Sequence, residues 1–373
     1  MKKALLVATV QSHICQFHKP LAEVLREDGW EIHVAAKDNL KEKNGLKLDF
    51  VDRVYEVPFC RSPLKASNVN AYRQLKVIIK NEDYDVIHCN TPVGGILARL
   101  AARKVRKNGT KVYYTAHGFH FYKGAPVKNW LMYYPIEKMF AKMTDKLITI
   151  VSEDYNFAKR KFKCPVYRIH GTGVDERKFS RITVEEKRIL RKQFGFKEEQ
   201  KIILCVGELL ANKNQEMIIR SMPQIIEQNP DTVLLIAGNG PRKDELEALI
   251  EALDITENVR MLGYVTNVHE YHKISDLLVS CSIREGLGLN VIEAMMIGNP
   301  VVVTNNRGHR ELINKGRNGY IVPVNNVERM TESVKKILFS RDAYEKFAHN
   351  AQEFVVLYGT ESVKKELKKI YEL

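Results

Sequence analysis

The sequence has no apolar run long enough to cross a bilayer. Its longest apolar runs, such as those at 201–206 and 299–304, have the length of a β-strand, whereas a membrane-spanning helix needs about 20 apolar residues. The N-terminus begins Met1-Lys2-Lys3, but the apolar stretch 4–10 ends at polar residues 11–13. This pattern favours the first strand of a fold over a signal peptide. We therefore expect a cytoplasmic protein.

Closely spaced cysteines, repeats and low-complexity segments are also missing. No two of the six cysteines have the CxxC spacing, which argues against a zinc site or a disulfide framework and favours small buried thiols in a reducing cytosol. The cysteines are Cys15, Cys60, Cys89, Cys164, Cys205 and Cys281. The absence of a repeat excludes solenoid and array architectures.

Acidic residues are scarce in the first half of the chain. Residues 1–170 contain 30 Lys and Arg against 16 Asp and Glu, whereas residues 171–373 contain 29 of each. The whole net charge of +14 therefore belongs to the first half. A basic half predicts an anionic partner, which can be a nucleic acid, a membrane surface or an anionic substrate.

Short apolar strands alternate with amphipathic helices along the whole chain. In the first half, strands are expected at 3–10, 31–36, 85–89, 111–115, 147–151 and 166–169, with helices at 19–28, 70–81 and 94–107. After a connector at 171–179, strands are expected at 201–207, 232–238, 259–262, 277–281 and 301–304, with helices at 214–227, 241–253, 290–297 and 360–373. This order predicts an α/β protein with two doubly wound parallel sheets. Such sheets bind ligands at the carboxyl ends of their strands.

The strongest functional motif is the segment 284–294, Arg-Glu-Gly-Leu-Gly-Leu-Asn-Val-Ile-Glu-Ala. It follows a predicted strand and opens a predicted helix. Gly286 and Gly288 allow a ligand to approach the backbone closely, and N–H groups at a helix N-terminus bind phosphate oxygens. Glu293, one turn into the helix, can reach ribose hydroxyls, and Glu285 can reach a sugar. The alternative is a glycine turn with two surface carboxylates.

The segment 285–304 resembles the signature of family-4 retaining glycosyltransferases with the GT-B fold. In this segment Glu285 and Glu293 precede Gly298-Asn299-Pro300 and an apolar strand. The resemblance extends over nearly the whole chain. Other family motifs are matched by a histidine loop at 115–119, an interdomain connector at 173–179, a phosphate-binding strand and loop at 206–213, and nucleotide-side loops at 238–241 and 262–265. Residues 8–18 are most similar to the exopolysaccharide and capsular polysaccharide branch.

The resemblance implies two Rossmann-like domains that face each other across a cleft. The N-terminal, acceptor-side domain would comprise 1–172 together with a C-terminal helix at about 357–373 that packs back on it. The nucleotide-sugar-binding domain would comprise 173–356. The implied reaction transfers a sugar from a nucleotide-sugar, with a UDP-sugar expected, and retains the anomeric configuration.

Three residues would carry this chemistry. Lys213, together with the amides of Gly286 and Gly288, would stabilise the charge on the departing diphosphate, so no metal or other cofactor is expected. His117 would contact the donor sugar, and Glu285 would position its hydroxyls. Taken without its context, His117 is better explained as a strand-end histidine with a local hydrogen bond, and only the following Gly118-Phe119 favour the functional interpretation.

The same match supplies further site residues. On the donor side these are Gly207, Glu208, Asn212, Asn214, Gly238, Gly240, Tyr264, Val265, Leu287 and Leu289, and the acceptor-side candidates are Ser12, His13, His18 and Phe119. His13 and His18 are equally explained as solvated loop residues. Two positions depart from the family pattern. Glu208 stands where members often carry an arginine, which removes one of two cations over the diphosphate, and residues 11–13 replace the usual paired glycines.

Two patterns suggest metal chemistry instead. Asp83-Tyr84-Asp85 matches the DxD of metal-dependent glycosyltransferases of the other main fold, but it precedes a predicted strand, so Asp85 is better explained as a strand-start residue. Five histidines suggest a metal cluster, but no pair has the spacing of helical ligands, and we expect no metal site. They are His13, His18, His88, His117 and His120.

The excess positive charge has two candidate explanations. Nucleic-acid binding is disfavoured, because no recognised module is present and the basic residues are dispersed. Basic clusters at 103–107 and 159–163 instead flank the segment 119–146, where aromatic and aliphatic residues alternate with lysines. This composition is typical of a membrane-interfacial surface, although a core helix with solvated lysines is an equal alternative. The family context favours the surface, because members of this branch often act on lipid-diphosphate-linked sugars at the cytoplasmic membrane face.

The sequence therefore predicts a retaining hexosyltransferase that extends a lipid-linked saccharide for a surface polysaccharide. It would act peripherally on the inner face of the cytoplasmic membrane. The alternative enzyme is a family-4 transferase that glycosylates a soluble small molecule. The alternative of another class is a non-catalytic protein that binds anionic surfaces or nucleic acid.

Overall fold

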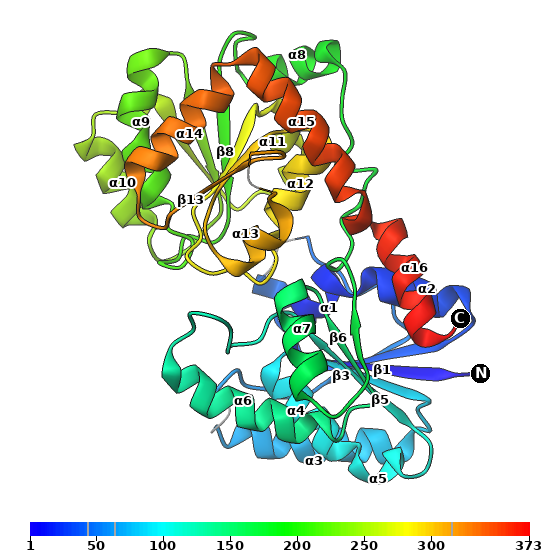
Figure 1. Ribbon diagram of the computed structural model, residues 1–373. Coiled ribbons are helices and arrows are strands. Elements are labelled where there is room, and N and C mark those ends of the chain that lie inside the picture. Colours follow the sequence, from blue (N-terminus) through cyan, green and yellow to red (C-terminus); the bar gives the residue numbers. More distant parts are fainter. Residues whose placement is uncertain (43–44, 63–64, 315) are drawn as a thin grey trace. The chain divides into compact units, whose positions relative to one another are not determined.

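The chain folds into two compact units. The computed structural model describes residues 1–42, 45–62, 65–314 and 316–373. Unit 1 comprises Met1–Gly173 and Thr360–Leu373, and unit 2 comprises Val174–Gly359 (Figure 1). The sequence analysis drew the boundaries at 172/173 and 356/357, which are one and three residues away from these.

Unit 1 is built on a seven-stranded parallel sheet. The strand order is β3-β2-β1-β4-β5-β6-β7. The strands are β1 (Lys3–Val10), β2 (Glu31–Lys37), β3 (Arg53–Glu56), β4 (Val86–Asn90), β5 (Lys111–Ala116), β6 (Lys146–Thr149) and β7 (Val166–Arg168). Because β1 and β5 both flank β4, the segments that follow them lie close together at the carboxyl edge of the sheet.

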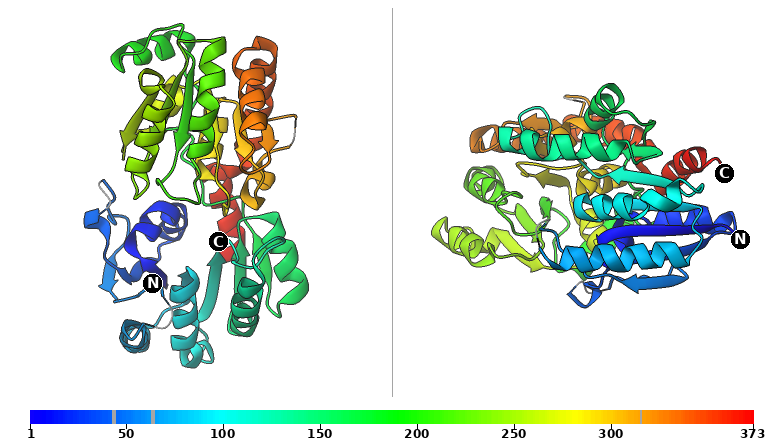
Figure 2. Two further views of the ribbon diagram at one scale, coloured as in Figure 1. Left: turned by 90° about the vertical axis from the view of Figure 1, so that its left-hand side faces the viewer. Right: turned by 90° about the horizontal axis from the view of Figure 1, so that it is seen from below.

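Helices cover both faces of this sheet (Figure 2). They are α1 (Gln11–Phe17), α2 (Lys19–Glu27), α3 (Ser67–Asn81), α4 (Pro92–Ala101), α5 (Arg103–Arg106), α6 (Val127–Ala141), α7 (Ser152–Lys161) and α16 (Thr360–Tyr371). Leu5 and Val7 of β1 face a core that includes residues of α3, α4, α6 and α7. Side chains alternate along a strand, so the residues between them face the opposite layer.

The C-terminal helix α16 packs on unit 1 beside α2, far from it in the sequence (Figure 1). Its Tyr371 hydroxyl lies 2.5 Å from Nδ1 of His88 on β4, and Nε2 of His88 lies 2.6 Å from Oγ1 of Thr115. Lys364 forms an ion pair with Glu23 of α2 at 2.5 Å. The helix therefore completes the layer over β4 and satisfies a fully buried histidine.

Unit 2 contains a six-stranded parallel sheet with the order β10-β9-β8-β11-β12-β13. The strands are β8 (Ile202–Val206), β9 (Val233–Ala237), β10 (Val259–Gly263), β11 (Leu277–Ser280), β12 (Val301–Thr304) and β13 (Tyr320–Val322). The helices are α8 (Val184–Gln193), α9 (Glu216–Gln228), α10 (Lys243–Ala252), α11 (Val268–Ile274), α12 (Leu289–Ile297), α13 (Arg307–Leu312), α14 (Val327–Leu338) and α15 (Arg341–Val355). Short 3₁₀ turns of the chain lie at Leu40–Glu42, Thr256–Asn258 and Val356–Tyr358.

Local sequence signals explain several helix starts in unit 2. Thr183 and Glu186 form a capping box at α8, in which each side chain accepts the backbone N–H of the other residue. Asn326 and Ser340 accept backbone N–H groups at the starts of α14 and α15. The apolar faces of α9, α10 and α14 pack against the sheet and share one core with it.

The main difference from the sequence analysis lies after β1. The polar segment expected to be a loop forms the helix α1, which ends at Phe17 before α2 begins at Lys19. The strands β3 and β13 and the helices α7, α8, α11 and α13 were not expected. The six cysteines are free thiols, and no helix in the described ranges combines the length and the apolarity that spanning a membrane requires.

Candidate active site

The loops that follow β8, β9, β11 and β12 form the expected donor edge of unit 2. The segment after β8 contains Lys213, and the segment after β11 contains Glu285. Lys213 Nζ lies 2.5 Å from Oε1 of Glu285, and the two side chains are 26% and 14% exposed. The structure therefore brings together the expected phosphate-binding cation and the expected sugar-binding carboxylate, which are 72 residues apart.

The glycine segment before α12 presents the start of this helix at the same edge. Gly288 adopts φ = 78°, a left-handed conformation that favours glycine, immediately before Leu289 begins α12. Asn290 donates its side-chain amide to the carbonyl oxygen of Val206 at the end of β8, at 3.0 Å. The N-terminus of α12 is thereby fixed beside the strand that leads to Lys213. A helix N-terminus held in this way can bind phosphate oxygens.

Gly238 and Gly240 serve backbone packing. A Cβ atom added at Gly238 would lie 2.0 Å from the carbonyl oxygen of Gly207, and one added at Gly240 would lie 2.5 Å from that of Leu209. Leu209 also donates its N–H to the carbonyl oxygen of Asn239 at 2.9 Å. These glycines therefore hold the loops after β8 and β9 in direct contact, which shapes the edge on which Lys213 lies.

The neighbouring asparagines are engaged in the scaffold. Asn212 donates its side-chain amide to the carbonyl oxygen of Arg284 at 2.9 Å, and Asn214 donates to Oδ1 of Asn325 at 3.0 Å. To donate hydrogen bonds to the diphosphate, Asn212 and Asn214 would first have to break these bonds. Asn212 instead ties the Lys213 loop to the Glu285 loop.

The remaining donor-side candidates differ in exposure. Glu293 on α12 has Oε2 3.4 Å from Nε2 of the buried His272, and its side chain is 19% exposed. Glu208 and Tyr264 are exposed, Val265 and Leu289 are half-buried, and Leu287 is buried. Leu287 therefore belongs to the support of the glycine loop, whereas Glu208 and Tyr264 lie on the surface of the edge.

Gly308 and His309 on α13 were missed by the sequence analysis. A Cβ atom at Gly308 would lie 2.9 Å from Cβ of Glu285, and the ring of His309 lies against Gly288. His309 Nδ1 lies 2.7 Å from the carbonyl oxygen of Thr304, and its Nε2 lies 3.1 Å from Oγ of Ser280. Burial lowers the pKa of His309 to about 4, so a neutral ring supports the donor loop. The sequence signal that could have indicated these two residues is the polar, glycine-containing segment 305–309 directly after the apolar strand 301–304.

Three histidines meet at the carboxyl edge of unit 1. His117 follows β5, His13 lies on α1, and His18 lies at the break between α1 and α2. The ring centroids are 4.5 Å apart for His13 and His117, 5.4 Å for His18 and His117, and 5.5 Å for His13 and His18. Burial lowers the pKa of all three, that of His117 to about 4. The rings are therefore neutral at pH 7.

These histidines were not expected to cluster, because their spacing does not place them on one face of a continuous helix. His13 and His18 are five residues apart, but the break between α1 and α2 turns both rings toward His117. His88, another member of the five histidines, has partners on both ring nitrogens. The fifth, His120, stacks on Tyr133 at 4.5 Å between ring centroids.

A pocket of about 200 Å³ opens beside this cluster in unit 1. Its lining includes His13, His117, Phe119, His120 and Tyr133. Phe119 is buried and stacks on Phe121 at 4.8 Å between ring centroids. The pocket is therefore aromatic and imidazole-lined, a composition suited to the apolar faces and hydroxyls of a sugar.

Two further candidates near the start of the chain, Ser12 and Asp85, form hydrogen bonds within the fold. Ser12 is buried and exchanges two hydrogen bonds with Asn39, at 3.0 and 2.9 Å. Asp85 accepts the backbone N–H of Lys3 at 2.8 Å just before β4, which agrees with its interpretation as a strand-start residue.

The surface of α6 combines apolar and basic residues only in part as expected. Val127 and Leu131 are 73% and 74% exposed, and Lys128, Lys138 and Lys142 are exposed on the same segment. Trp130 and Tyr134, which were expected to reach a membrane, pack inward against Phe157 at 5.5 and 5.6 Å between ring centroids. The core-helix alternative therefore holds for the inward side of α6, and the membrane role of its exposed side stays a prediction.

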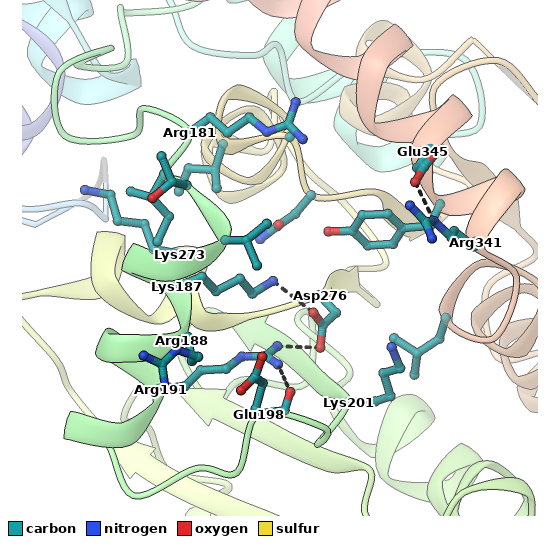
Figure 3. A pocket seen from close by; sticks show the side chains of 18 of the residues that line it. Arg181, Lys187, Arg188, Arg191, Glu198, Lys201, Lys273, Asp276, Arg341 and Glu345 are labelled. Carbon is teal, nitrogen blue, oxygen red and sulfur yellow. Dashed lines mark hydrogen bonds and ion pairs between the residues drawn. The ribbon is translucent and has the colours of Figure 1, made fainter.

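A pocket of about 710 Å³ lies at the opposite edge of the sheet of unit 2, where its lining includes Lys201, Asp276 and Asn299, which precede β8, β11 and β12. Figure 3 shows the side chains that line it. Asp276 at its floor accepts hydrogen bonds from Lys187 at 2.9 Å, from Arg191 at 2.7 Å and from the backbone N–H of Ile202 at 2.8 Å. These bonds anchor α8 to the sheet. The charged residues at this pocket therefore have a structural role, and the pocket is separate from the donor edge.

Comparisons with known proteins agree with this arrangement. Residues 186–354 match the family described as "Glycosyl transferases group 1", and residues 3–151 match "Glycosyl transferase 4-like". The chain is 40% identical over 372 residues to the putative glycosyltransferase EpsD of Bacillus subtilis strain 168, covering 99% of this chain and 96% of that protein. It is 26% identical over 324 residues to the UDP-Gal:alpha-D-GlcNAc-diphosphoundecaprenol alpha-1,3-galactosyltransferase of Escherichia coli, covering 84% and 82%.

A solved structure shares the fold over its full length. HepE of Anabaena in complex with UDP matches with a TM-score of 0.77 at 18% identity and covers 100% of both chains. The two family matches lie on the two units in succession, and a 40% identical relative spans 99% of the chain. The chain therefore belongs to the family-4 glycosyltransferases of the GT-B fold.

Proposed function

We propose that this glycosyltransferase moves a sugar, with retention of anomeric configuration, from a UDP-sugar to a lipid-linked saccharide for a surface polysaccharide, at the inner face of the cytoplasmic membrane. The observation that carries the donor half of the proposal is the pair of Lys213 and Glu285 beside the N-terminus of α12. The pair unites a cation for the leaving group and a carboxylate for the sugar at one edge.

When the donor binds, the ammonium group of Lys213 exchanges its ion pair with Glu285 for one with the diphosphate. Breaking the bond between the sugar carbon and the diphosphate leaves negative charge on the phosphate oxygens. A fixed ammonium and backbone N–H groups stabilise such charge when they are aimed at it before the reaction. The amides at Gly286 and Gly288 complete this set, so the chemistry requires no metal or other cofactor.

Release of Lys213 frees Glu285 for the sugar. A carboxylate only accepts hydrogen bonds, so it positions the sugar through its hydroxyls. His117 acts on the donor sugar through a neutral imidazole, because burial lowers its pKa to about 4. The acceptor hydroxyl attacks from the side of the leaving group and gives its proton to the departing diphosphate, so the anomeric configuration is retained.

The choice of UDP is supported by two relatives. The Escherichia coli relative is named for transfer from UDP-Gal, and the matching fold of HepE was solved with UDP and with UDP-glucose. Glu293 is the candidate for the ribose hydroxyls, because it lies one turn into α12 with a partly exposed side chain.

The lipid-linked acceptor is supported by the exposed face of α6. Val127, Leu131 and Met139 are at least half exposed there and alternate with exposed lysines. Apolar residues set among basic ones are favourable at an anionic membrane surface. The Escherichia coli relative is named for a diphosphoundecaprenol-linked acceptor.

Nucleotide-sugars screened for thermal stabilisation test the donor, because a ligand that binds only the folded state raises its apparent stability. We expect UDP-sugars to raise Tm more than GDP- or ADP-sugars, and transfer to a diphospholipid-linked saccharide to continue in excess chelator. Strict dependence on Mn²⁺ would overturn the metal-free mechanism. Nucleotide binding without transfer or donor hydrolysis would favour the non-catalytic alternative.

Binding to vesicles tests the membrane surface. Each Lys or Arg near an anionic membrane contributes about 1 kcal/mol, within a Debye length. Replacing Lys159, Arg160, Lys161 and Lys163 by Gln should therefore weaken binding to anionic vesicles at low salt. The same number of changes at Lys243, Arg329, Lys335 and Lys346 of unit 2 is the control and should have little effect. A wild-type chain that ignores anionic vesicles at low salt would make a soluble acceptor the better hypothesis.

A further inference from the structure

We propose that His13, His18 and His117 form a binding site for a divalent transition-metal ion of the zinc class, and that the bound ion blocks sugar transfer. The blocking half of this proposal rests on the proposed function, because it assumes that His117 contacts the donor sugar. The binding half rests only on the geometry of unit 1.

The three rings each bring one nitrogen close to those of the other two. One ring nitrogen from each histidine lies within 4.8 Å of the other two. The Nε2 atoms of all three are buried and have no hydrogen-bond partner among the described residues. A buried polar atom without a partner costs about 1–3 kcal/mol. Three such atoms on three neighbouring rings indicate a group that the protein itself does not supply.

Small ring movements convert this cluster into a coordination site. Zinc binds histidine nitrogens at about 2.0–2.1 Å in a tetrahedral arrangement, which places the nitrogens roughly 3.3 Å apart. Closing from 4.8 Å to that separation moves each nitrogen by less than about 1 Å. The three histidines lie on α1, at the end of α1 and after β5, so side-chain rotations can achieve the movement without shifting the sheet.

The ligand chemistry favours zinc, cobalt or nickel over magnesium or calcium. Neutral imidazoles suit late transition metals, whereas magnesium and calcium prefer oxygen ligands. In the part of the chain that the structure describes, no Cys, Asp or Glu side chain joins the three histidines in this cluster. Neighbouring His88 is committed to Tyr371 and Thr115, so the protein offers three ligands.

A fourth coordination position would be open toward the pocket. His13 and His117 line the cavity of about 200 Å³, and zinc sites with three protein ligands keep one position for water or another molecule. A metal ion here would occupy a ring nitrogen of His117, the residue that acts on the sugar in the proposed function. Metal and donor sugar would then exclude each other, so the ion inhibits and chelation restores transfer.

Metal binding is tested without reference to activity. Co²⁺ titrated into the intact chain should produce visible d–d absorption typical of a four-coordinate site, and equilibrium dialysis should find one Zn²⁺ per chain. His13→Gln should lower the affinity about tenfold or more, on the scale of losses at metal sites. His349→Gln is the matched control, because His349 is 72% exposed on α15. His18→Gln is a second test, interpreted only if its melting curve shows a folded chain.

A transfer assay then tests the inhibition. Zn²⁺ should inhibit the wild type and the His349 variant at the concentrations at which it binds, and EDTA should reverse the effect. Stoichiometric binding that His13→Gln weakens as expected, without any transfer activity in the metal-free chain, would leave the site standing and refute the proposed function. Transfer without stoichiometric metal binding would refute the site and leave the function standing. In that case the unpaired ring nitrogens would be hydrogen-bond partners for saccharide hydroxyls.

Discussion

Replacing Glu285 by glutamine should tighten the binding of free UDP and at the same time remove most of the transfer activity. In the free enzyme Lys213 is held by Glu285 at 2.5 Å. UDP must break this ion pair before its diphosphate can take the ammonium group. Glutamine keeps the shape of the side chain but removes its charge, so the variant no longer competes with the diphosphate for Lys213.

The exposure of the two side chains sets the magnitude. Exposed ion pairs contribute about 0.2–1 kcal/mol, whereas breaking a buried pair by removing one partner costs about 3–5 kcal/mol. The pair of Lys213 and Glu285 is 26% and 14% exposed and falls between these limits, at about 1–2 kcal/mol. Because 1.4 kcal/mol corresponds to a factor of ten, UDP should bind roughly 5–30-fold more tightly. The lost contact with the sugar should lower kcat by about 10²–10³, as for the loss of one preorganised group.

Calorimetric titration with UDP and steady-state transfer rates measure the two effects. Glu332→Gln is the control, because it changes the net charge equally but removes only an exposed ion pair with Arg329 on α14. Lys213→Met should act in the opposite direction and weaken UDP binding. If Glu285→Gln leaves the UDP affinity unchanged or lowers it, the diphosphate does not compete for Lys213, and the assigned exchange of partners is wrong.

Three further variants test separate parts of the structure. Glu293→Ala should weaken UDP binding about tenfold or more, since hydrogen bonds to charged groups contribute about 1.5–3 kcal/mol, while leaving pyrophosphate binding unchanged; an equal loss for both ligands would contradict a ribose contact. Gly308→Ala places a Cβ atom 2.9 Å from Cβ of Glu285 and should cost about 1–3 kcal/mol, seen as a lower Tm together with weaker UDP binding; wild-type values for both would show that the donor loop tolerates displacement. Tyr371→Phe removes the partner of the buried His88 and should lower the free energy of unfolding of unit 1 by about 1–3 kcal/mol, and a denaturant titration that matches the wild type would count against this anchor.

The sequence predicted the features that are encoded locally. The strand 301–304 and the helix that begins near residue 290 were predicted within one residue, because apolar runs and flanking glycines mark them. The motif around Glu285 and Glu293 was likewise visible, since its strand, loop and helix are continuous in the chain.

The features that were missed depend on contacts between distant segments. His18 and His117 are brought together by the strand order β1-β4-β5 and by a helix break that spacing rules do not anticipate. The inward orientation of Trp130 depends on Phe121, in the loop before α6, and on Phe157 of α7. His309 acts through its contact with Gly288, and no pattern around either residue indicates that contact.

The position of α16 has a consequence for how the protein is made. Unit 1 receives its last helix from residues 360–373, after the whole of unit 2 has been synthesised. At about 5–20 residues per second, synthesis from residue 174 to Tyr371 takes on the order of ten to forty seconds. During this time His88 and the sheet face around it lack their partner. During this interval the nascent chain exposes an unfinished apolar layer to which chaperones can bind. Expression of residues 1–173 alone should therefore give an aggregation-prone product, and supplying the C-terminal segment as a separate peptide should improve its solubility.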